Sequence, residues 1–145
     1  MHAMHAVPAA VAVAVTFVWL GMVLAISFLE APLKFRAPDV TVRIGLGIGR
    51  LVFRALNRVE AVLAVVVITA VALGRPPALV VIPAAVAVLV LAAQLTAIRP
   101  ALNRRSDRVL GGEELPRSRA HLLYAVAESL KALALLALGI ATLTA

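Results

Sequence analysis

Cysteine is absent from this chain of 145 residues, and aromatic residues make up only 4% of it. Without cysteine there is no disulfide framework, no thiolate metal site and no cysteine nucleophile. Acidic residues are also few, 7 against 14 lysines and arginines, which gives a formal net charge of +7. A basic surface can bind nucleic acid, but no nucleic-acid motif or aromatic platform accompanies these charges, so we expect no nucleic-acid partner.

Apolar residues dominate what remains, because they make up 63% of the chain, whereas ordinary soluble domains are about half apolar. A membrane-spanning helix needs roughly 20 apolar residues, and residues 8–30, 78–98 and 121–144 each supply such a stretch. The apolar run at 61–74 is too short alone, so we expect its helix to continue backwards through Glu60 to about Thr41. We therefore predict one all-α domain over residues 1–145, an integral membrane up-down-up-down four-helix bundle with spans near 8–30, 50–74, 78–98 and 121–144.

Proline and glycine mark the expected connections between these helices. Pro32 and Pro38 are expected to end the first helix, and the sequence Gly-Arg-Pro-Pro at 74–77 is expected to form a tight turn. We expect Pro100 to bend or end the third span, and residues 99–119 to form a polar loop.

The basic residues are distributed unevenly among the connections. Only Arg75 lies between the second and third apolar stretches, whereas the connections on the other side carry Lys34, Arg36, Arg43, Arg50, Arg54, Arg58, Arg99, Arg104, Arg105, Arg108, Arg117 and Arg119. Connections rich in lysine and arginine stay on the cytoplasmic side of a membrane. This pattern predicts a multi-pass protein of a bacterial-type inner membrane with both termini outside.

Three glutamates, Glu30, Glu60 and Glu128, lie in or against apolar stretches, where a carboxylate costs on the order of 3 kcal/mol or more unless it is paired or wet. At about 1.5 Å per residue, Glu60 and Lys131 lie about 21 Å from the outer edge of their helices. Gln94 and Glu128 lie at about 25 Å by the same measure, within a hydrocarbon core about 30 Å thick. These four residues are predicted to form one polar layer in the cytoplasmic third, with Glu30 at its rim.

On the fourth helix, His121, Tyr124, Glu128 and Lys131 follow spacings that place them on one face. Such a stripe could relay protons or orient a polar ligand. It could equally be an interfacial belt, with His121 and Tyr124 at the headgroups and Glu128 paired with Lys131.

On the second helix, Arg50, Arg54 and Asn57 share one face. Arginine binds carboxylates and phosphates in a bidentate geometry, so this face could bind an anion or a lipid headgroup at the cytoplasmic mouth. Alternatively, the arginines contact anionic lipid and balance the charge of Glu30 or Glu128.

Two short motifs invite ligand interpretations that we do not favour. The sequence Gly45-x-Gly47-x-Gly49 lacks the strand–turn–helix context of a nucleotide-binding loop, so we expect it to permit close helix packing. His2 and His5 suit copper in type, but two histidines three residues apart in a chain terminus do not define a site. The alternatives of a metal-binding or a disordered terminus stay open.

Several stretches of this sequence resemble a family of small four-helix membrane proteins of unknown function. They are Ile-Ser-Phe-Leu-Glu-Ala-Pro-Leu-Lys-Phe at 26–35, Arg-Leu-Val-Phe at 50–53 and His-Leu-Leu-Tyr at 121–124. That family is similar to the human transmembrane protein linked to cisplatin resistance. The resemblance implies a fold and a membrane location rather than an activity, and it carries over Glu30, His121 and Glu128 as polar residues. A weaker similarity, Arg-Ala-Leu-Asn-Arg-Val-Glu at 54–60, is to membrane glutathione-transferase-like enzymes, although the histidine of their signature is missing.

The working hypothesis is a protein that binds or transports a small polar or charged solute through a polar cavity on the cytoplasmic side. Its expected site comprises Glu30, Arg54, Asn57, Glu60, Gln94, His121, Tyr124, Glu128 and Lys131. Glu60 and Glu128 are the expected central groups, balanced by Arg54 and Lys131, with Glu30 at the mouth.

Two other functions stay open at this point, a structural or assembly subunit and a glutathione-transferase-like enzyme that uses Arg54 and Glu60. Membrane lipid is the expected partner, and a homo-oligomer or a larger membrane complex stays open. The sequence identifies no cofactor and no metal.

Overall fold

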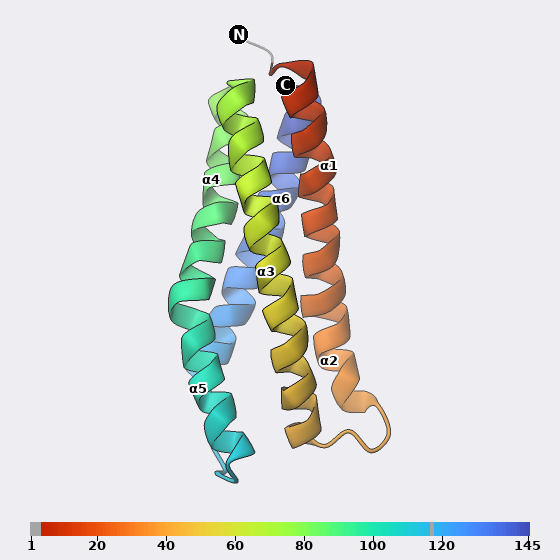
Figure 1. Ribbon diagram of the computed structural model, residues 1–145, viewed down its shortest axis with the longest axis vertical. Helices are drawn as coiled ribbons and strands as arrows, with labels where there is room; N and C mark the ends of the chain where they lie inside the picture. The colour runs from red at the N-terminus through yellow and green to blue at the C-terminus, as the bar shows by residue number, and fades with distance from the viewer. Residues whose placement is uncertain (1–3, 117) are drawn as a thin grey trace.

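The computed structural model describes residues 4–116 and 118–145, which form four long helices joined by short connections (Figure 1). Two of the long helices are interrupted by wider π-helical turns. In chain order the elements are α1 (Ala6–Val23), a π-helical turn (Leu24–Glu30), α2 (Ala31–Leu33), a 3-10 turn (Lys34–Arg36), α3 (Val42–Gly74), α4 (Ala78–Ala93), a second π-helical turn (Gln94–Ile98), α5 (Arg99–Leu110) and α6 (Arg119–Thr144). The described residues contain no strand, so the prediction of an all-α, four-helix chain is confirmed.

All four helices are long and apolar enough to cross a membrane, at 31, 33, 33 and 26 residues. A helix of 33 residues extends about 50 Å, which is longer than a hydrocarbon core of about 30 Å. The surplus turns lie at one end of the bundle, where they carry most of the arginines. We call this the arginine end, and the opposite end, where the N-terminal and C-terminal segments meet the 75–77 connection, the terminal end (Figure 1).

Pro32 does not end the first helix and Pro100 does not end the third, although the first helix does end before Pro38, as predicted. The first helix continues past Pro32 to Arg36, and the third continues past Pro100 to Leu110, so residues 99–110 of the expected loop are helical. Proline removes a backbone donor and crowds the preceding turn, which often ends a helix. Here the helix continues, because the turn before each proline becomes π-helical. The N–H of Ala31 donates to the Ile26 carbonyl, and that of Arg99 to the Gln94 carbonyl, each five residues earlier.

The helix α3 begins where the sequence predicted. The Thr41 hydroxyl caps its first turn by accepting a hydrogen bond from the Ile44 N–H at 3.2 Å. A Cβ at Gly45 would overlap the Phe35 ring, and one at Gly49 would lie 3.0 Å from Lys34 Nζ, so these two glycines do permit close packing. Gly47 has open space around it and contributes nothing to that packing.

Apolar side chains close the half of the bundle nearer the terminal end. Val67 on α3, Val80 on α4 and Leu135 and Leu138 on α6 are fully buried at its centre. At this end the His5 N–H donates to the Gly74 carbonyl at 3.4 Å, which joins the start of α1 to the end of α3. We refer to this half as the closed half, because its interior is filled by aliphatic packing.

Candidate functional site

A fully buried lysine lies at the centre of the bundle, where it contacts polar groups from three helices. Lys131 Nζ is 2.5 Å from Glu60 Oε1 and 2.8 Å from Glu128 Oε1, and it donates to Gln94 Oε1 at 2.8 Å. None of these four side chains is more than 2% exposed. The structure therefore brings together the four residues of the expected polar layer.

The first helix joins this layer through a residue that the sequence analysis missed. The Trp19 indole N–H donates to Glu60 Oε1 at 2.9 Å, and the Trp19 side chain is fully buried. All four helices therefore contribute to the polar layer, which we define as Trp19, Glu60, Gln94, Glu128 and Lys131. The sequence did contain a signal for this residue. Trp19 is the only tryptophan, and it lies about 17 Å below Pro8 along the first helix, at a depth similar to that of the other polar residues.

The polar layer has more hydrogen-bonding capacity than it uses. Glu60 Oε2, Glu128 Oε2 and Gln94 Nε2 are buried without a hydrogen-bond partner among the described residues. Removing two carboxylates and an ammonium from water is costly, and their mutual attraction offsets that cost only while every partner is present.

On the arginine side of the polar layer lies a cavity of about 490 Å³, which we call the central cavity. Its walls come from the first helix beyond residue 26 and from α3, α5 and α6. Most of its surface is apolar, and the polar and charged side chains in its wall include Ser27, Lys34, Arg99, His121, Tyr124 and Glu128. Glu128 therefore belongs both to the polar layer and to the cavity wall, whereas Glu60 and Lys131 lie behind it.

Arg99 lies between two aromatic rings in the wall of this cavity. Its guanidinium carbon is 4.0 Å from the centre of the Phe53 ring and 4.2 Å from that of Tyr124. Cation–π contacts of this kind hold a guanidinium in place without neutralising it. The Nε and Nη2 atoms of Arg99 are buried with no hydrogen-bond partner in the described part of the chain. The sequence analysis placed Arg99 in a loop because it ended the third helix at Ile98.

Other charges near the mouth of the central cavity are already paired. Lys34 Nζ lies 3.5 Å from Glu30 Oε2, and Arg50 forms an ion pair with Asp107. Glu30, expected at the mouth, pairs with Lys34 and does not line the cavity. His121 does line it and is exposed.

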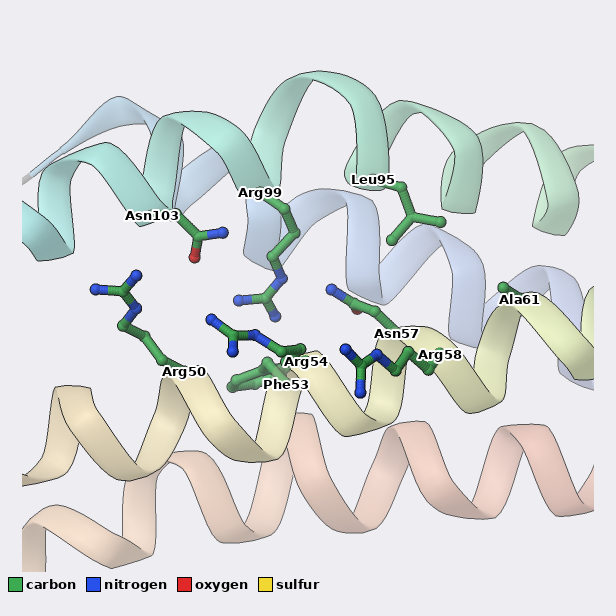
Figure 2. A pocket seen from close by; sticks show the side chains of 9 residues that line it. All are labelled: Arg50, Phe53, Arg54, Asn57, Arg58, Ala61, Leu95, Arg99 and Asn103. Atoms are coloured by element: carbon green, nitrogen blue, oxygen red, sulfur yellow. The ribbon is translucent and has the colours of Figure 1, made fainter.

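A second hollow of about 310 Å³ lies between α3 and the helix formed by α4 and α5, and we call it the arginine crevice (Figure 2). Its lining includes Arg50, Phe53, Arg54, Asn57, Arg58 and Arg99. Arg50, Phe53 and Arg99 also line the central cavity, whereas Arg54, Asn57 and Arg58 line only the crevice. Arg54 is thus not among the groups that balance the polar layer, where Lys131 is the only cation of the described residues that pairs with the two carboxylates.

Arg54 and Glu60 do not share a pocket, although a glutathione-type enzyme was expected to use both. Arg54 is exposed in the crevice, while Glu60 points into the bundle and is 1% exposed. No group of three histidine, aspartate or glutamate side chains among the described residues could hold a metal ion. His2 lies outside the described residues, so a metal site at His2 and His5 stays untested.

The geometry thus divides the expected site residues among three places. The polar layer holds Glu60, Gln94, Glu128 and Lys131, the central cavity has His121, Tyr124 and Glu128 in its wall, and the crevice has Arg54 and Asn57. Glu30 lies outside all three. The chain matches no protein-family model, no curated protein and no solved structure.

Proposed function

We propose that this chain is a multi-pass protein of a bacterial-type inner membrane that binds or transports a small polar or charged solute in the central cavity. Four helices long and apolar enough to cross a membrane support the membrane location. The concentration of arginines at one end supports an orientation with that end in the cytoplasm and both termini outside. The resemblance to the small four-helix membrane proteins of unknown function agrees with this proposal and adds no activity to it.

The proposal of a solute site rests on the position of Glu128, a buried carboxylate in the wall of the central cavity. Glu128 Oε1 lies 2.8 Å from Lys131 Nζ, while Glu128 Oε2 has no hydrogen-bond partner among the described residues. The side chain is 1% exposed, yet it lines a cavity of about 490 Å³. An ionisable side chain inside a membrane segment is costly and usually serves a function, and this one lies with Tyr124 in the wall of a space large enough for a small molecule.

The remaining polar groups of the cavity indicate the chemistry of the solute. Arg99 contributes a guanidinium that no described carboxylate neutralises, and Glu128 contributes a hydrogen-bond acceptor. A solute with an acidic group near Arg99 and a donor group near Glu128 would satisfy both. His121, exposed in the wall of the same cavity, is suited to exchange protons with the cytoplasm.

Binding and transport make different demands on the polar layer. The layer and the aliphatic packing of the closed half separate the central cavity from the terminal end. Binding leaves this barrier intact, whereas transport requires the contacts of Lys131 to open. The π-helical turns Leu24–Glu30 and Gln94–Ile98 lie beside the layer and are natural places for such bending.

Native mass spectrometry of the gently purified full-length protein tests the proposal. The wild-type protein should carry a small-molecule adduct, and Glu128→Gln should lose it while Lys131 keeps its ion pair with Glu60. Glu60→Gln is expected to weaken retention through its effect on Lys131. Glu114→Gln is the matched control, because Glu114 is exposed and lines neither hollow. Adduct retained by both Glu128→Gln and Glu60→Gln would sink the proposal.

A structural or assembly subunit is the second candidate, and one observation favours it. The polar layer joins all four helices through hydrogen bonds and ion pairs, and buried polar contacts can serve only to fix helix register. In that case the same spectra would show a larger complex or a homo-oligomer and no small-molecule adduct on the chain.

A further inference from the structure

The arginine crevice contains cationic side chains that the proposed solute site does not use. In Figure 2, Arg54 and Arg99 point toward one another across the gap between α3 and the helix formed by α4 and α5, and the amides of Asn57 and Asn103 flank them. Four arginines line this hollow of about 310 Å³, and no carboxylate of the described residues does. The site therefore concentrates positive charge and hydrogen-bond donors in one place.

Most of this charge is not neutralised from within the chain. Arg50 forms an ion pair with Asp107, but Arg54, Arg58 and Arg99 form no ion pair with any described residue. Arg99 provides a second, independent observation, because its buried Nε and Nη2 have no partner in the described part of the chain. A buried donor without a partner is costly, and a bound anion would remove that cost.

The position of the crevice along the bundle favours a membrane lipid as the source of the anion. Along α3, Arg58 lies about 24 Å and Arg54 about 30 Å from Gly74 at the terminal end. A hydrocarbon core about 30 Å thick would therefore end near Arg54. Because Arg54 and Arg58 are exposed on the flank of the bundle, the crevice opens sideways at the level of lipid phosphates.

We propose that the arginine crevice binds a phosphate monoester, and that the group is the headgroup of an acidic lipid. A phosphate monoester carries nearly two negative charges at neutral pH and three acceptor oxygens, which suits three unpaired guanidinium groups. A phosphate diester carries one charge and offers fewer terminal oxygens. Arginine binds such groups through paired, charge-assisted hydrogen bonds, with Asn57 and Asn103 available as further donors.

The crevice proposal goes beyond the solute site; the two sites share Arg99, so they are tested through residues that only one of them contains. Arg54 and Arg58 do not line the central cavity, and Glu128 does not line the crevice. Glu128→Gln, which should abolish solute retention, is therefore expected to keep full lipid binding. The two proposals fail in different variants of the same protein.

Native mass spectrometry of the full-length protein in detergent provides the test, with phosphatidic acid as the monoester and phosphatidylglycerol of identical acyl chains as the diester. The wild-type protein should retain phosphatidic acid about tenfold more tightly than phosphatidylglycerol, because the monoester offers the guanidinium groups a further charge and a further terminal oxygen. The double variant Arg54→Gln, Arg58→Gln should lose this preference. The double variant Arg43→Gln, Arg104→Gln removes equal charge from exposed positions outside the crevice and should keep the preference.

A further arm with inorganic phosphate distinguishes the two sources of the ligand. Phosphatidic acid that binds and is not displaced by inorganic phosphate assigns the crevice to lipid. Displacement, with inorganic phosphate bound alone and lost in the Arg54 and Arg58 variant, supports a phosphate site but overturns its assignment to lipid. Equal retention of the monoester and the diester, or equal losses in the two double variants, would overturn the phosphate site itself. Thermal midpoints of both double variants establish that each is folded.

Discussion

The two halves of the bundle solve the same packing problem differently. In the closed half, aliphatic residues such as Val67, Val80 and Leu138 fill the space between the helices and are fully buried. In the arginine half, hollows of about 490 and 310 Å³ remain, lined by charged and aromatic side chains. This contrast agrees with the proposals that place ligands in the arginine half.

The polar layer is the boundary between these halves, and Lys131 holds it together. The layer contacts the aliphatic core on one side and, through Glu128, the central cavity on the other. Because the layer is as deeply buried as the closed half, we expect substitutions in it to destabilise the protein as strongly as substitutions in a packed core. The predictions below test this expectation.

Lys131→Met should have the largest effect. It leaves Glu60 and Glu128 buried without the cation that both contact at present. Breaking a buried ion pair from one side costs about 3–5 kcal/mol, so the thermal midpoint of the detergent-solubilised protein should fall steeply. Arg104→Met removes an exposed cation from α5 and should change the free energy of unfolding by about 0.5 kcal/mol or less. If the thermal midpoints of Lys131→Met and Arg104→Met were similar, the ion pairs of the polar layer would contribute little to the stability of the bundle.

Trp19→Phe should have a smaller effect, confined to the side of the layer that faces the closed half. The variant keeps most of the aromatic packing and loses the hydrogen bond of 2.9 Å to Glu60. A hydrogen bond to a charged group contributes about 1.5–3 kcal/mol. Combining Trp19→Phe with Glu60→Gln should give a cost below the sum of the single losses, measured as a coupling free energy from thermal unfolding. Additive losses would mean that Trp19 acts by packing alone.

The polar layer could be predicted from the sequence because helix geometry converts position into depth. Glu60, Gln94, Glu128 and Lys131 lie at similar heights on three helices, and a costly charge must find its partner. Trp19 lay at a similar depth but was overlooked, because tryptophan is as often a packing residue as a hydrogen-bond donor. The number and character of the helices followed from apolar runs, which are long enough to span a membrane.

The walls of the two hollows could be predicted only in part. The shared face of Arg50, Arg54 and Asn57 was predicted and lines the crevice, but the contribution of Arg99 depends on how Pro100 is accommodated and part of the central cavity wall on how Pro32 is. Pro32 and Pro100 were expected to interrupt their helices, and both helices continue through π-helical turns. That continuation places Arg99 on a helix between Phe53 and Tyr124 rather than in a loop. Whether a proline ends or bends a helix depends on the surrounding packing, which the local sequence does not contain.

Gly47→Ala should have the smallest effect and the opposite sign. Glycine inside a helix costs roughly 0.5–1 kcal/mol relative to alanine, and a Cβ at Gly47 would meet nothing within 4 Å. The substitution should therefore raise the free energy of unfolding by about that amount. Gly45→Ala is the matched control two residues earlier, because its Cβ would overlap the Phe35 ring at the wall of the central cavity. If Gly45→Ala stabilised the protein as much as Gly47→Ala, the Phe35 ring would move aside at no cost. The cavity wall there would then be adaptable, in contrast to the fixed packing of the closed half.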